Sequence, residues 1–99
     1  MMLVHNGVVR AWSRADRAPV RAVRVRPDRR RMQDICRELS QRPGIFRILA
    51  EAAEGELKPG DDLLFLVVAG DIRENVTSAF AELLDRIKTE AVIKEETTA

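Results

Sequence analysis

GELKPGDDLLFLVVAGDIRENVTSAFAELLDRIKTEAVIKEE, residues 55–96, is the stretch that decides the fold. Its tetrapeptide 58–61 has proline and glycine where a type II turn requires them. The apolar run at 63–69 then reads as a strand, and since it shows no alternation we expect both of its faces to be covered. Beyond it, Asp71 and Glu74 have the spacing of a capping box, which predicts that a helix begins there.

The predicted helix has one apolar stripe over about four turns. Its members are Ile72, Val76, Ala79, Phe80, Leu83, Leu84 and Ile87. Val92 and Ile93 predict a short edge strand after the helix, and residues 95–99 are expected to form a frayed tail.

Upstream of this stretch the pattern predicts strands at 3–12 and 20–26, separated by a polar loop at 13–19. In the second strand, Val23 and Val25 fall on one face, whereas Ala22, Arg24 and Arg26 fall on the other.

A helix follows, with Asp28 as its N-cap and an apolar stripe of Met32, Ile35, Cys36 and Leu39, and Pro43-Gly44 ends it. Residues 45–54 are compatible with helix or strand, and we favour a strand in a hairpin with 63–69. The order β-β-α-β-β-α-(β) predicts a single α+β domain over residues 1–99, with two helices packed on a largely antiparallel sheet.

Composition narrows the class of protein. Of the 99 residues, 45% are apolar and 33% are charged, as in ordinary globular proteins. The one cysteine allows no internal disulfide, and neither a signal peptide nor a run of about 20 apolar residues is present, so we expect a cytoplasmic protein without a membrane partner. Residues 1–42 have a net charge of +7 and residues 43–99 one of −6. The basic half indicates either an anionic partner or a solvated arginine-rich face.

The candidate site residues are cations. Arg10 ends a strand, Arg73 lies in the first turn of the second helix, Lys88 in its last turn, and Lys94 after it. Fixed positive charge and a helix N-terminus both favour an anion. Arg73 and Lys88 are fifteen residues apart, about 22 Å along a helix, so one small ligand could meet both only in a symmetric dimer.

The other reactive side chains have plainer interpretations. His5, the only histidine, is expected on a strand surface, because no second histidine or cysteine lies near it in the sequence. Cys36 is expected as a packed core thiol. No metal-ligand cluster, P-loop or dinucleotide fingerprint occurs, so no bound cofactor or metal is expected.

At these residues the chain resembles the large, catalytic subunit of molybdopterin synthase. The resemblance covers most of the chain and rests on Gly7-Val8-Val9-Arg10, the Gly-Glu-Leu-Lys-Pro-Gly-Asp turn at 55–61, the strand at 63–68, Arg73, the helix to Asp85, and Lys88-Thr89.

The resemblance implies an α/β hammerhead fold, a homodimer, and a heterotetramer with a small ubiquitin-like subunit that carries a C-terminal thiocarboxylate. Sulfur would pass from it to cyclic pyranopterin monophosphate, a pterin phosphate substrate, in molybdenum cofactor biosynthesis. The implied catalytic residues are Lys88 and Lys94. The implied substrate-binding positions are Val8, Val9, Arg10, Ile72 and Arg73, with Ile72 standing where the family usually has histidine.

Two other hypotheses stay open. The first is a catalytically degenerate family member that keeps the fold and the dimer as an interaction protein, because Ile72 and Ala91-Val92-Ile93 depart from the family's histidine and its Pro-x-Trp. The second is nucleic-acid binding through the arginines of 21–31. Against it, no aromatic residue lies between Trp12 and Phe46, whereas base-stacking sites interleave aromatics with charge.

Overall fold

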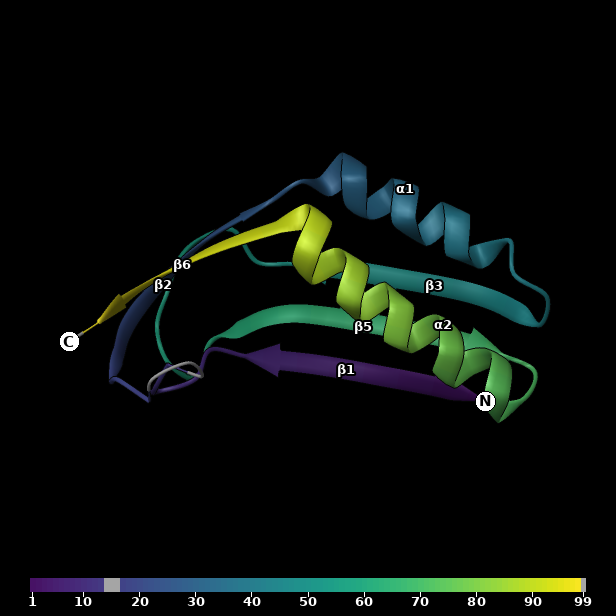
Figure 1. Ribbon diagram of the computed structural model, residues 1–99, viewed down its shortest axis with the longest axis horizontal. Coiled ribbons are helices and arrows are strands. Elements are labelled where there is room, and N and C mark those ends of the chain that lie inside the picture. Colours follow the sequence, from purple (N-terminus) through teal and green to yellow (C-terminus); the bar gives the residue numbers. More distant parts are fainter. Residues whose placement is uncertain (14–16, 99) are drawn as a thin grey trace.

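Two three-stranded antiparallel sheets and two helices make up the fold in the computed structural model, which describes residues 1–13 and 17–98 (Figure 1). The first sheet has the order β1 (Met2–Val8), β5 (Asp62–Gly70), β3 (Ile45–Ala52). The second has the order β4 (Gly55–Leu57), β2 (Val20–Pro27), β6 (Val92–Thr98). Helices α1 (Arg29–Ser40) and α2 (Arg73–Arg86) cover the first sheet, and a π-helical turn, η1 (Ile87–Ala91), joins α2 to β6. The predicted α+β class is confirmed.

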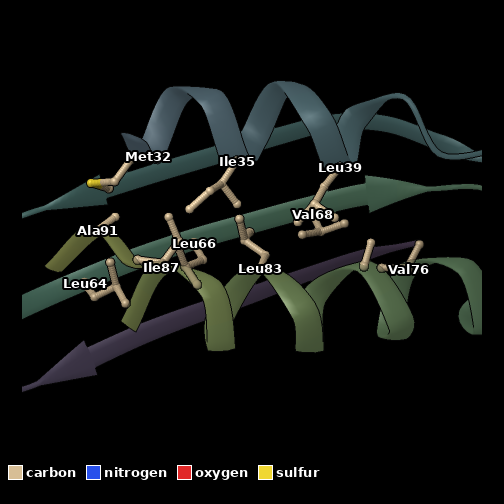
Figure 2. Close-up of a cluster of buried hydrophobic side chains, with 11 residues drawn as sticks. Met32, Ile35, Leu39, Leu64, Leu66, Val68, Val76, Leu83, Ile87 and Ala91 are labelled. Carbon is tan, nitrogen blue, oxygen red and sulfur yellow. The ribbon is translucent and has the colours of Figure 1, made fainter. Parts of the chain in front are cut away.

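The core lies between the two helices and the first sheet, as Figure 2 shows. Four side chains of the predicted stripe are fully buried: positions 76, 79 and 83 lie in helix α2, and position 87 begins η1. Phe80 and Leu84 pack at the margin of this core. Ile72, the first residue of the predicted stripe, is instead 53% exposed because it is the N-cap residue and lies outside the helix.

The first helix agrees with its prediction. The Asp28 carboxylate accepts a hydrogen bond from the Arg31 N–H at 3.0 Å, which caps α1. Met32, Ile35 and Leu39 are buried, and Cys36 packs against the same core. Burial raises the pKa of the Cys36 thiol, which disfavours the thiolate and agrees with a packing role.

The second helix begins differently from the prediction. The Asp71 carboxylate accepts hydrogen bonds from the Ile72 N–H and the Asn75 amide, so it does not form the reciprocal capping box with Glu74. The reason is one of phase: helical geometry begins at Arg73, which places Asp71 one residue too early to be the N-cap.

The prediction that both faces of the strand at 63–69 are covered is wrong for the single chain. Leu64, Leu66 and Val68 face the core, whereas Phe65 on the opposite face is 42% exposed. β5 does pair with β3, which confirms the strand at 45–52. The segment that connects β3 to β5 contains β4, which pairs with β2 in the other sheet.

Two boundaries and the facing of one residue also differ. β1 ends at Val8, and Trp12 forms only an isolated bridge with Pro19. Ala22 is buried with Val23 because the register of β2 against β6 shifts between Val20 and Ala22. The predicted tail is largely strand: β6 runs to Thr98 along the whole of β2, and residue 99 lies outside the described part.

Candidate functional site

A cavity of about 490 Å³ opens where the ends of the two sheets meet the π-helical turn. This volume is in the range of roughly 300–1,000 Å³ that small-molecule sites occupy. Residues from β1, the segment after it, β2, β5, η1 and β6 line the cavity, and they are His5, Gly7, Val8, Val9, Arg10, Ser13, Val23, Leu63, Leu64, Lys88, Val92, Lys94 and Glu96.

Three of the predicted cations, Arg10, Lys88 and Lys94, line this one cavity. They come from three different parts of the fold, so the tertiary structure rather than sequence proximity gathers them. Positive charges aimed at one small volume are suited to an anionic ligand.

The turn at 58–61 positions Arg10. The Asp61 N–H donates to the Lys58 carbonyl at 3.0 Å, and Gly60 has a φ of 93°, as the predicted type II turn requires. The turn then holds Val9 from both sides, because the Val9 N–H donates to the Asp61 carbonyl and the Gly60 N–H donates to the Val9 carbonyl. The turn at 58–61 therefore fixes the backbone immediately before Arg10.

The π-helical turn positions the two lysines. Its wide geometry is seen in the Val92 N–H, which donates to the Ile87 carbonyl five residues earlier. Lys88 lies on this turn, and the chain continues directly into β6. Alternation along β6 then places Val92, Lys94 and Glu96 toward the cavity. Local π-helical geometry is frequent at functional sites.

His5 is a member of the site that the sequence interpretation missed. It lines the cavity, and its ring centroid lies 6.2 Å from that of Phe80 in α2. Burial lowers the pKa of His5, and the positive charge of Lys88 lowers it further. The sequence feature that could have placed His5 at the cavity is its spacing, because His5 and Gly7 are two residues apart on one strand and so share a face.

Arg73 and Ile72 do not line the cavity. They lie at the N-terminal end of α2, whereas Lys88 follows its C-terminal end. The Asp71 carboxylate already accepts a hydrogen bond from the Ile72 N–H there. The expectation that Arg73 reaches a shared ligand only from a second copy of the chain therefore stays a prediction.

Within 1–13 and 17–98, no helix is long and apolar enough to span a bilayer. In the same part of the chain, no cluster of three or more histidine, cysteine, aspartate or glutamate side chains could hold a metal ion.

Residues 1–90 match the sequence pattern of the MoaE protein family. The chain belongs to this family. It is 33% identical over 69 residues to a probable molybdopterin synthase from Haloferax volcanii, a match that covers 69% of this chain and 26% of that protein. The chain thus spans about a quarter of that relative's length.

Two solved structures have the same fold. Molybdopterin synthase from Staphylococcus aureus superposes with a TM-score of 0.84 at 19% identity, covering 100% of this chain and 74% of that chain. The complex of subunits 1 and 2 of the molybdopterin-converting factor from Helicobacter pylori gives a TM-score of 0.75 at 14% identity, covering 99% of this chain and 66% of that chain. At these identities the likeness is one of fold, and it agrees with the membership of the MoaE family.

Proposed function

We propose that this MoaE family member is the catalytic subunit of a molybdopterin synthase. It would transfer sulfur from the C-terminal thiocarboxylate of a small ubiquitin-like subunit to cyclic pyranopterin monophosphate. The observation that carries the proposal is the cavity of about 490 Å³ in which Arg10, Lys88 and Lys94 converge.

Each cation has a distinct role in this proposal. The Arg10 guanidinium binds the phosphate, because its planar donors match phosphate oxygens. Lys88 and Lys94 stabilise the negative charge of the incoming thiocarboxylate and of the sulfur–carbon intermediate. Fixed ammonium groups at that point lower the barrier because the site does not need to reorganise as charge develops.

The partners follow from the same chemistry. A protein tail can bring a thiocarboxylate to the open mouth of the cavity, and one structural neighbour is a complex of two subunits. We further propose a homodimer in which Arg73 of one copy completes the cavity of the other, since Arg73 and Lys88 lie beyond opposite ends of α2. No bound cofactor is required, because the pterin phosphate is the substrate.

The degenerate interaction protein is the second candidate, and Ile72 favours it. This side chain is 53% exposed at the start of α2 and has no hydrogen-bonding group to offer an anion. A protein of this kind would bind the small subunit and release no product.

Reconstitution separates the two functions. The chain is combined with a cognate small subunit as its thiocarboxylate and with the cyclic precursor, and dithiolene formation is measured in a single turnover. Replacing Lys88 by alanine should slow the reaction by about 10²–10³-fold, the usual loss when one charge-stabilising group is removed. The matched control is Lys58→Ala, an exposed lysine on the turn outside the cavity, which should react at the wild-type rate.

The outcomes are distinct. Binding of the small subunit with no dithiolene from the wild-type chain would favour the interaction protein. Wild-type rates in both the Lys88→Ala and Lys58→Ala variants would refute the catalytic role of the cavity lysine.

A further inference from the structure

His5 is held at a defined place on the cavity wall. Its ring lies against Phe80 on one side, with the two ring planes tilted by 58°. On another side it lies over Gly7, where an added Cβ would come within 2.9 Å of His5 Nε2. The absence of a side chain at position 7 therefore leaves room for the imidazole beside the cavity that both residues line.

The chemistry of His5 differs from that of the three cations. Arginine and lysine side chains can only donate hydrogen bonds, whereas a neutral imidazole has one donor and one acceptor nitrogen. Burial and the positive charge of Lys88 both lower the pKa of His5, so the neutral form predominates at physiological pH. The site thus has an uncharged group that can accept a hydrogen bond or a proton next to groups that cannot.

We propose that His5 is a further ligand-binding residue of the cavity, whose imidazole hydrogen-bonds directly to an anionic heterocyclic ligand. The identity of this ligand class rests on the proposed function, since the cations select the phosphate and the imidazole selects a polar group of the ring system.

The charges around His5 define its expected response. Lys88 from η1, Arg10 from the segment after β1, and Lys94 and Glu96 from β6 line the same cavity. The Lys88 charge favours neutral His5, and Glu96 is the one carboxylate among the described residues that line the cavity. A bound anion compensates this positive charge, so it should raise the pKa of His5 and should itself bind more tightly as His5 protonates.

Nuclear magnetic resonance can test this on the intact chain, because His5 is its only histidine and gives one assignable pair of imidazole signals. The probe is 3′,5′-cyclic GMP, a bicyclic heterocycle with a cyclic phosphodiester whose single charge does not titrate near neutral pH. We expect titration with the probe to shift the imidazole signals and to raise the pKa read from them.

Two variants distinguish ligand binding from packing. His5→Phe retains a ring against Phe80 and over Gly7, so its melting temperature should match that of the wild type, but it should bind the probe about 2–10-fold more weakly, the usual effect of one lost hydrogen bond. His5→Gln retains hydrogen bonding without titrating, and we expect it to bind the probe with an affinity that does not vary between pH 5 and 8.

Two results would overturn the inference: imidazole signals unchanged at millimolar probe, or a His5→Phe variant that binds as tightly as the wild type with the same pH dependence. The experiment needs no small subunit, so its outcome is separate from the sulfur-transfer assay. If the chain transfers sulfur but the imidazole signals do not change with the probe, only the role of His5 is refuted. If the imidazole signals change but the chain forms no dithiolene, only the proposed function is refuted.

Discussion

Mixing two inactive variants should restore sulfur transfer if each site is built from two copies of the chain. The variants are Arg73→Ala and Lys88→Ala. Fifteen residues of helix separate these positions by about 22 Å, more than two extended side chains can bridge around one small ligand. Arg73 accordingly does not line the cavity that Lys88 enters. In a two-fold symmetric dimer, each cavity would therefore take Arg73 from the partner.

The expected recovery follows from counting sites. After random exchange, about half of the dimers contain one chain of each variant. In every mixed dimer, one site carries both substitutions and the other carries neither. Intact sites are then about a quarter of the total, whereas each variant alone should retain about 1% of the activity if one lost charged group costs about 10²-fold. Mixing should raise the activity from about 1% to about 25% of the wild type.

The matched control mixes Lys88→Ala with Lys94→Ala. These two lysines line the cavity of the same chain. A mixed dimer therefore has one site without Lys88 and one without Lys94, and neither is intact. We expect this mixture to stay at the activity of its parents.

The assay is single-turnover dithiolene formation by dimers that carry a different affinity tag on each chain, purified over both tags so that only mixed dimers are measured. In this purified population the expected recovery is about half of the wild-type activity, one intact site in two. Doubly purified Arg73→Ala/Lys88→Ala dimers as inactive as their parents would refute the shared site. Recovery in the Lys88→Ala/Lys94→Ala control would instead contradict the single-chain composition of the cavity.

Three further predictions concern the scaffold that holds the site. Leu66→Ala should lower the free energy of unfolding in urea by about 2–5 kcal/mol, because Leu66 is fully buried in β5, whereas Phe46→Ala, at a side chain that is 72% exposed, should change it little. Asp28→Ala should cost about 1 kcal/mol in the same measurement by removing the cap that accepts the Arg31 N–H, and Asp28→Asn should retain most of it. Hydrogen bonds from Arg31 and Arg86 lower the pKa of Glu90 below its usual 4.5. The ionised Glu90 carboxylate should therefore contribute fully to stability above pH 4.5, and this contribution should fade as the pH falls through the lowered pKa. Thermal melts of Glu90→Gln should show a weaker dependence on acid than those of the wild type, and an unchanged dependence would contradict this.

Local chemistry made the turn, both helices and the main strands predictable. Proline and glycine at 59–60, an aspartate at position 28 and apolar stripes at helical spacing each act over a few residues. Two of the predictions failed where a one-residue shift decides the result. The capping box at Asp71 is out of phase with the helix, and a shifted register in β2 turns Ala22 inward.

The lining of the cavity was predictable in part. Arg10, Lys88 and Lys94 carry a chemistry that composition reveals, since they are cations at the ends of elements. Their convergence depends on contacts between distant residues, such as the bonds between Val9 and the turn at 58–61. His5 was missed for the same reason: no reactive residue lies near it in the sequence, and Lys88 approaches it only in the folded chain.

Ion pairs between the two halves account for part of their uneven charge. Arg29 bonds Glu54, Arg31 bonds Glu90, and Arg42 bonds Glu82, in each case a basic-half arginine with an acidic-half carboxylate. Exposed pairs of this kind contribute little stability, up to about 1 kcal/mol each. They do, however, neutralise three of the eleven arginines of residues 1–42.

In the second sheet, an arginine of β2 likewise faces carboxylates on the neighbouring strands. Arg24 lies in register between Glu56 of β4 and Glu95 of β6, so opposite charges face each other across both pairings. This complementarity also explains why the charged residues after position 94 form a strand rather than a frayed tail. Pairing with β2 fixes the alternation that turns Lys94 toward the cavity, and the arginine-rich strand therefore serves the site as a template for β6.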